Sequence, residues 1–193
     1  MLRNDDLNEF FAFVMHRCYR DVKLDITDDR VNPLYGQKVS TLINNRKCYG
    51  VATSFGDKHA YTIVCWVKDI PAGYLSFTEM RKRSYIELES LCVSTSFERR
   101  GIGTLLVMAL ILFAGRFKYP LIGAFAEPSS QGLLARIGFN GDLNADDAAY
   151  ITYDVGNTNK LADRFEQCDA LRGDLRSALL HAANGRHRKR YQH

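Results

Sequence analysis

Apolar and polar residues alternate along much of the middle of this chain, with the two-residue period that is typical of β-strands. The first two alternating runs are separated by the turn Lys68-Asp-Ile-Pro71 and predict a β-hairpin. A third run follows closely, which favours an antiparallel meander. In all, five runs predict strands: 60–67, 72–77, 85–93, 120–125 and 148–155.

Apolar positions three and four residues apart predict helices between these strands. Residues 104–117 are apolar at most positions, as in a buried helix, and residues 129–137 predict a short helix that ends at Gly138-Phe139. The run from Leu105 to Gly115 is too short to span a bilayer, so we expect no membrane segment.

The first quarter of the chain predicts two helices, one capped by Asp5 and Asp6 and one over residues 34–43. Residues 25–30 are expected to form an acidic loop between them, either solvated or able to favour a cationic amine. The sequence does not open with an obvious first strand. We expect residues 47–54 to form that strand, displaced from its usual place in the order of elements.

Apolar residues at helical spacing also follow the last predicted strand. They predict an amphipathic helix that begins at the N-cap Thr158. Its apolar face requires a cover, either the same domain or a second copy in a homodimer. The apolar positions are Leu161, Phe165, Cys168, Leu171, Leu175, Leu179 and Ala182.

Composition adds limits to this picture. A hydrophobic content of 46% in 193 residues is sufficient for one substantial core. The net charge of +4 is contributed by the tail, residues 186–193, which is either a solvated end or a patch for a polyanion such as nucleic acid.

Cysteine usage and the N-terminus indicate a reduced, cytoplasmic protein. The five cysteines are an odd number without a C-x-x-C spacing, which argues against a disulfide framework. The N-terminus is acidic before its apolar stretch, unlike a secretory signal. The five histidines share no ligand spacing with cysteines or carboxylates, so we predict no metal site.

Between the third strand and the long helix the chain reads Glu98-Arg99-Arg100-Gly101-Ile102-Gly103. Amides at a helix start lack intrahelical partners and carry partial positive charge, so anions bind there. Gly101 and Gly103 leave those amides accessible, and Arg99 and Arg100 add positive charge. Neither a P-loop nor a dinucleotide fingerprint fits, because the former needs a Gly-Lys-Ser/Thr and the latter a glycine where Leu106 stands.

The loop and the order of elements around it resemble the GNAT N-acetyltransferase superfamily over roughly residues 47–155. In that superfamily a Gln/Arg-x-x-Gly-x-Gly/Ala loop binds the pyrophosphate of acetyl-coenzyme A. Glu98 stands where Gln or Arg is usual and brings a negative charge near the phosphates. The resemblance implies that the cosubstrate is bound by Arg99, Arg100, Gly101, Ile102, Gly103 and Thr104.

The resemblance implies an α/β (α+β) fold with a mixed, mostly antiparallel central sheet flanked by helices. We expect residues 1–156 to form the GNAT acyltransferase domain. Residues 157–185 then form a C-terminal helical extension and residues 186–193 the basic tail.

Two glutamates on the third strand are candidates for the general base. Glu87 lies fourteen residues before Gly101, the spacing at which the protein-lysine acetyltransferases of this superfamily carry their catalytic glutamate. Glu89 is the alternate base. Strand alternation puts both glutamates on one face of the sheet, together with Leu91 and Val93. On one face, each glutamate is expected to raise the pKa of the other. A competing interpretation makes the glutamates ion partners of basic residues 81–83.

The resemblance also implies that Leu91, Cys92 and Val93 offer backbone to the pantetheine arm. Cys92 has no evident adjacent base, so we expect it to be buried packing and not a nucleophile. Many members carry a tyrosine that protonates the departing thiolate; here Leu134 occupies its position and Glu127 that of an upstream asparagine. Ser130 is expected to reach the coenzyme, or solvent to protonate the leaving group.

The resemblance therefore implies an N-acetyltransferase that transfers an acetyl group from acetyl-CoA to a small-molecule or protein amine by direct attack in a ternary complex. The alternative is a GNAT-fold binding or structural module with weak or no catalysis, to which the basic tail could add polyanion binding. The acceptor amine itself is not identified by these residues.

Overall fold

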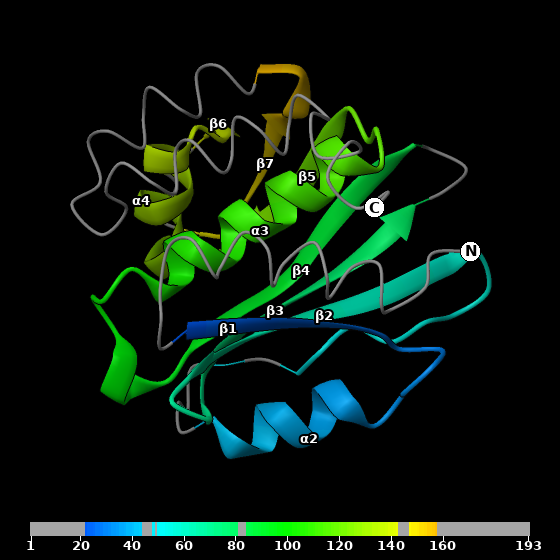
Figure 1. Ribbon diagram of the computed structural model, residues 1–193. Coiled ribbons are helices and arrows are strands. Elements are labelled where there is room, and N and C mark those ends of the chain that lie inside the picture. The colour runs from blue at the N-terminus through cyan, green and yellow to red at the C-terminus, as the bar shows by residue number, and fades with distance from the viewer. Residues whose placement is uncertain (1–21, 44–47, 49, 81–83, 143–146, 158–193) are drawn as a thin grey trace, which may run out of the picture.

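The computed structural model describes residues 22–43, 48, 50–80, 84–142 and 147–157 (Figure 1). The N-terminal helix capped by Asp5 and Asp6, the C-terminal helix from Thr158 and the basic tail lie outside the described residues. So do residues 81–83, the predicted ion partners of the glutamates.

A seven-stranded sheet with the order β1-β2-β3-β4-β5-β7-β6 forms the centre of the molecule. Only β4 and β5 pair in parallel; the other neighbours are antiparallel. The strands are β1 Val22–Asp28, β2 Lys58–Val67, β3 Ile70–Met80, β4 Tyr85–Val93, β5 Leu121–Ala126, β6 Asn140–Gly141 and β7 Ala149–Asp154.

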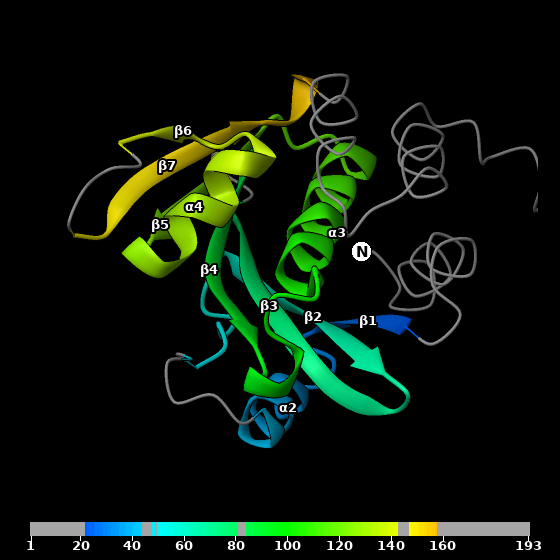
Figure 2. The same ribbon diagram turned by 90° about the vertical axis from the view of Figure 1, so that its left-hand side faces the viewer.

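Three helices cover the two faces of this sheet. α3 (Ile102–Arg116) and α4 (Pro128–Ile137) lie on one face, and α2 (Tyr35–Leu42) lies on the other (Figures 1 and 2). Residues 102–114 of α3 are buried except Gly103, as expected for a helix that is apolar nearly all round. Two short 3-10 turns, Thr95–Phe97 and Val155–Asn157, follow β4 and β7.

The predicted fold class and the central succession of elements are confirmed. The hairpin is β2 and β3, the third strand is β4, and the buried and short helices are α3 and α4. The last two predicted strands are β5 and β7, while the two-residue β6 was not predicted.

The prediction of an acidic loop over residues 25–30 is wrong, because most of that segment belongs to β1. Leu24, Ile26 and Asp28 are buried and alternate with more exposed neighbours, which is the strand period. The acidic residues drew the loop interpretation, although the apolar alternation was present. β1 lies at the sheet edge, with three strands between it and β5, so its carboxylates do not border the point at which β4 and β5 separate.

The strand predicted over residues 47–54 is also wrong for the described part of it. Residues 48 and 50–54 form no strand, and only Phe55 makes an isolated bridge, to Lys58. Side chains hold this segment: the Ala52 amide donates to Ser76 Oγ at 2.7 Å and the Ser54 amide donates to Asp29 Oδ2 at 2.7 Å. Amides satisfied in this way do not require a neighbouring strand.

A β-bulge interrupts the ladder between β3 and β4. Ser76 is opposite Ser90, but the next residue, Phe77, is opposite Leu88. Glu89 is therefore the extra residue on β4. A bulge of this kind bends the strand and shifts the side-chain alternation by one position.

The bulge places the two halves of β4 in opposite alternation. Before it, Ile86 and Leu88 lie in the core beneath α3; after it, Leu91 and Val93 pack against that same core. Cys92 instead joins the cluster beneath α2. The expectation that Leu91 and Val93 share the face of the two glutamates is wrong for this reason.

A network of ionisable side chains ties β1 to the ends of β2 and β3. Buried Asp28 accepts a hydrogen bond from Arg30 Nε at 2.9 Å and a second from Arg30 Nη2. Arg30 Nη1 lies 3.1 Å from His59 Nε2, and His59 Nδ1 lies 3.4 Å from Glu79 Oε2. Glu79 also accepts a hydrogen bond from Tyr119. This network closes one edge of the α3 core with charges that are hydrogen-bonded.

Candidate active site

The segment between β4 and α3 folds into the helix start that the sequence predicts. α3 begins at Ile102, and its N-cap Gly101 has φ 82° and ψ 0°, a left-handed conformation that glycine adopts without steric cost. Arg99 also has a positive φ, 61°. Gly103 and Thr104 follow in the first turn, where helix amides lack intrahelical acceptors. The chain therefore presents first-turn amides next to two arginines.

The side chains around this loop are mostly exposed. Glu98, Arg99 and Arg100 all face solvent. The Arg100 guanidinium lies 5.7 Å from the centre of the Phe97 ring, a cation–π contact that holds it beside the helix start. A small, mainly apolar cavity of about 160 Å³ borders Arg100 and Gly101. The structure thus brings together all the predicted phosphate-binding residues.

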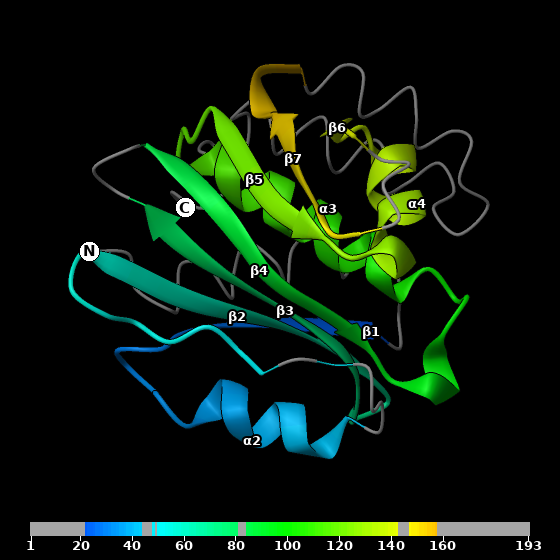
Figure 3. The same cartoon turned by 180° about the vertical axis from the view of Figure 1, so that it is seen from behind.

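Strands β4 and β5 separate next to this loop. Their parallel ladder runs from the pair Tyr85–Leu121 to the pair Leu88–Ala124 and ends there, one residue before the bulge (Figure 3). Residues 91–93 pair with β3 and lie beyond the last β4–β5 pair. The backbone that the resemblance predicts to contact the pantetheine arm therefore lies where β4 has no β5 partner.

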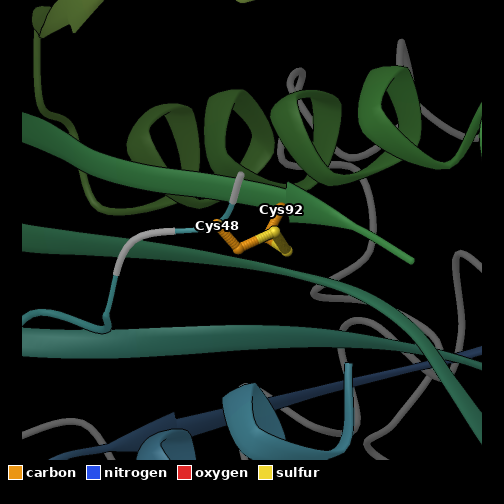
Figure 4. Close-up of a disulfide and its surroundings, with 2 residues drawn as sticks. All are labelled: Cys48 and Cys92. Atoms are coloured by element: carbon orange, nitrogen blue, oxygen red, sulfur yellow. A yellow bond between two sulfur atoms is a disulfide. The ribbon is translucent and has the colours of Figure 1, made fainter. Parts of the chain in front are cut away.

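Cys92 forms a disulfide with Cys48, with 5.4 Å between the two Cα atoms (Figure 4). The expectation of no disulfide is wrong, and so is that of a Cys92 thiol that only fills space. An odd number of cysteines argues against a framework of bridges but does not exclude one pair. Cys92 is nevertheless buried, beside Val39, Val64 and Tyr74. The bond ties the segment before β2 to β4 on the α2 face.

The two glutamates lie on the face of the sheet opposite α3. Thr78, which is directly opposite Glu87 in the ladder, donates a hydrogen bond to Glu89 Oε1 at 2.8 Å. Burial raises the pKa of Glu87, and the negative charge of Glu89 raises it further. Hydrogen bonds from Tyr150 and Tyr85 and the charge of Lys58 act in the opposite direction but do not cancel the increase.

Tyr150 on β7 was not predicted as a site residue. Its hydroxyl donates to Glu87 Oε2 at 3.4 Å, across the intervening strand β5. A Cβ at Gly123 of β5 would lie 2.2 Å from that hydroxyl and 3.0 Å from Glu87 Oε2, so only glycine leaves room for the contact. A glycine within a predicted strand was the one available sign of such a close approach.

Leu134, at the position of the usual tyrosine, and Ser130 both lie on α4. Leu134 is 2% exposed and belongs to the core beneath α3. The Ser130 hydroxyl donates to the carbonyl of Glu127, the N-cap residue, at 2.9 Å. Leu134 has no proton to give to a thiolate, and the contact of Ser130 with the coenzyme stays a prediction.

The described residues contain neither a cluster of metal-ligating side chains nor a helix that could span a membrane. Within them, no group of three or more His, Cys, Asp or Glu side chains could hold a metal ion. None of the helices in this part of the chain is long and apolar enough to cross a membrane.

Comparison with known proteins identifies the class. Residues 22–139 match the model of the acetyltransferase (GNAT) family, and the chain belongs to that family. The family and the geometry of the helix start together support acyl transfer as the general activity. No curated protein matches the sequence significantly.

Several solved structures share the fold. A GNAT-family protein of Chromobacterium violaceum has a TM-score of 0.52 at 17% identity over 72% of this chain and 91% of that one. Nourseothricin acetyltransferase has a TM-score of 0.51 at 11% identity, over 70% and 99%. Naa50 of Arabidopsis thaliana, in complex with the bisubstrate analogue CoA-Ac-MVNAL, has a TM-score of 0.50 at 16% identity, over 69% and 99%.

Proposed function

We propose that this protein is an N-acetyltransferase that transfers an acetyl group from acetyl-CoA to a primary amine by direct attack in a ternary complex. The observation that carries the proposal is the half-buried Glu87, with its raised pKa, beside the gap between β4 and β5. The acceptor is a small-molecule or protein amine. Naa50, which shares the fold, was solved with a CoA conjugate, and this supports the choice of cosubstrate.

The residues present fit the cosubstrate. The first-turn amides of α3 and the guanidinium groups of Arg99 and Arg100 would hold its diphosphate. Leu91, Cys92 and Val93 would offer backbone to the pantetheine amides at the open side of β4. Acetyl-CoA would supply the activated acyl group as a thioester. Glu98, exposed beside the loop, would weaken phosphate binding without blocking it.

Glu87 would receive the proton that the amine must lose. An alkyl ammonium with a pKa of about 10.4 is almost entirely protonated at pH 7, and its deprotonation costs roughly 4 to 5 kcal/mol. A carboxylate with a raised pKa is a better proton acceptor than an ordinary surface glutamate. Glu89 raises that pKa and serves as the alternate base.

The described cysteines do not favour a covalent acyl-enzyme. The Sγ atom of Cys92 is bonded to Cys48. Burial raises the pKa of the Cys65 thiol to about 12, so it is not ionised near neutrality. Direct attack of the amine on the thioester carbonyl is the simpler route, and solvent would protonate the departing thiolate because Leu134 is buried.

Calorimetry and thiol release test the proposal in sequence. We expect acetyl-CoA and CoA to bind, and amine-dependent thiol release to fall at least about tenfold in Glu87→Gln at pH 7.5. Titration of both cofactors without heat would refute coenzyme binding. Binding of both, with no thiol release across a panel of amines, would favour the alternative of a catalytically inactive binding module, which the buried Leu134 and the exposed Glu98 allow.

A further inference from the structure

The outer face of β4, β5 and β7 carries two large aromatic side chains in contact with solvent. Phe125 is 71% exposed and Tyr150 is 45% exposed. No helix in the described part of the chain covers this face, which is turned toward the viewer in Figure 3. An aromatic surface beside a reacting centre is a candidate binding surface.

The two rings are held in a defined arrangement. Phe125 and Tyr150 are directly opposite each other in the β5–β7 ladder, with ring centres 5.0 Å apart and planes at 61°. The hydroxyl of Tyr150 reaches Glu87, and Gly123 leaves the room for it to do so. Phe125 is thereby linked to the proposed base through a single phenol ring. Preorganised rings lose little conformational entropy when a ligand binds.

The charges around the rings favour a cation. Glu87 and Glu89 supply two carboxylates, while Lys58 is the cation whose charge acts on Glu87. Aromatic faces attract alkylammonium groups, and the attraction grows as the group is desolvated. An anionic or purely apolar ligand would gain less from this combination.

The nitrogen that reacts and the nitrogen that binds the aromatic pair as a cation cannot be the same atom of the acceptor. The attacking nitrogen must give its proton to Glu87, so it is neutral when the C–N bond forms. A cation that remains on the aromatic pair through the reaction must therefore be a second one. Because it is bound equally before and during the reaction, it lowers KM and leaves kcat largely unaffected.

From this arrangement we infer that Phe125 and Tyr150 form a subsite for a second positive charge on the acceptor, so that the preferred substrates are dicationic amines. This inference rests on the proposed function. The reacting amine would lie at Glu87, and the second cation would lie against the Phe125 ring, about the length of one phenol ring away. A diaminoalkane and a lysine followed by another basic residue share this chemistry.

Acetylation of butane-1,4-diamine and of butylamine compares acceptors with and without the second charge. We expect KM to be about tenfold lower for the diamine. Phe125→Leu, which keeps an apolar side chain without a ring, should remove most of that difference through KM. Phe125→Trp should preserve it. Val31→Ala, at an exposed apolar position near the opposite edge of the sheet, is the matched control.

Two dipeptide amides, acetyl-Lys-Arg and acetyl-Lys-Ala, distinguish the sources of the second charge. Each preference is the ratio of KM for the singly charged acceptor to KM for the dicationic one. A larger ratio for the acetyl-Lys-Ala and acetyl-Lys-Arg pair supports a protein acceptor, and a larger ratio for the butylamine and butane-1,4-diamine pair supports a free polyamine. Either preference, if Phe125→Leu abolishes it, supports the subsite.

Other outcomes overturn the inference. Equal KM values for diamine and monoamine, or equal losses for both in Phe125→Leu, would reduce the rings to an apolar surface and leave the acetyltransferase intact. A dimer that dissociates in Phe125→Leu, with the KM ratio unchanged, would make this face a self-association surface. If no amine is acetylated, the proposed function fails. Calorimetric titration of butane-1,4-diamine into the wild type and into Phe125→Leu then still tests the subsite, and a wild type that does not bind the diamine refutes it.

Discussion

At the scale of single residues, the properties of Glu87 arise from side chains on three different strands. Glu89 comes from the same strand, Tyr150 from β7 and Lys58 from β2. The sequence predicted the two glutamates and their mutual repulsion, because a fixed two-residue spacing within one strand is enough to infer both. It could not predict Tyr150, whose contact depends on Gly123 and on the order of strands in space.

Opposite shifts of the pH profile are expected from the two neighbours of Glu87. Glu89→Gln removes a charge that raises the Glu87 pKa, so the acidic limb of kcat/KM should move to lower pH. Tyr150→Phe removes a hydrogen bond that lowers this pKa, so the limb should move to higher pH. The pH dependence of kcat/KM, measured for both variants with the same acceptor, checks the two signs. If the acidic limb moves in the same direction in both variants, Glu87 is not the titrating base.

At the scale of elements, the transition from β4 to α3 forms the proposed cofactor end of the site. The sequence predicted this transition well because strand, loop and helix are contiguous and local rules apply. It missed the bulge one residue beyond the last β4–β5 pair, since nothing in the alternation of residues 85–93 indicates an extra residue. It also missed β1, whose apolar alternation was outweighed by the two acidic residues of the strand and by Asp29, which follows it.

Gly101→Ala should weaken cofactor binding. The left-handed backbone at Gly101 costs an L-residue roughly 1–2 kcal/mol, which the loop would relieve by turning its amides away from the diphosphate. We expect the Kd for CoA measured by calorimetry to rise about tenfold. Gly101→Asn is the control, because asparagine tolerates this conformation better. Unchanged affinity in the alanine variant would argue against the first-turn amides as the phosphate site.

At the scale of the whole molecule, contacts between distant segments close the structure. Arg30 Nη1 lies 3.1 Å from His59 Nε2 and ties the end of the edge strand to β2, and the Cys48–Cys92 bond ties the segment that follows α2 to β4. Neither contact was predicted. Such pairings depend on which segments meet in space, and sequence spacing carries almost no information about this.

Arg30→Ala should destabilise the fold by about 1.5–3 kcal/mol, roughly 5–10 °C in Tm, by leaving buried Asp28 without its charged partner. Burial alone would raise the pKa of Asp28, but the hydrogen bonds and charge of Arg30 lower it below 3.8. The stabilisation is therefore present above that pH and lost as pH falls through the lower native pKa. Thermal melts between pH 2 and 7 should show the two proteins converging in acid.

Lys23→Ala is the matched control for this variant. Lys23 Nζ lies 3.0 Å from Asp25 Oδ1 on the same strand, but the lysine side chain is 69% exposed. An exposed pair contributes less than about 1 kcal/mol. An equal loss of stability in both variants would show that the effect of Arg30 is not due to the burial of its partner.

Non-reducing tryptic mapping should recover the peptide 48–58 linked to the peptide 84–99, which contain Cys48 and Cys92. Reduction should separate them. Disulfides persist mainly in oxidising compartments, so the same map made on protein alkylated in intact cells also tests the predicted cytoplasmic location. Recovery of both peptides singly alkylated without reduction would contradict the bond.

The extra residue in β4 gives one strand two independent roles. Before Glu89 in the sequence, the even-numbered residues of β4 belong to the α3 core; after it, the odd-numbered residues do. A substitution at Leu88 or Leu91 therefore acts on the same core, while one at Glu87 or Cys92 acts on the opposite side of the sheet. Evolution can thus vary the proposed proton acceptor at one end of the strand and the attachment of the loop at the other without moving the hydrophobic interior. A sequence alignment that omits this single insertion would exchange inside for outside over the last four residues.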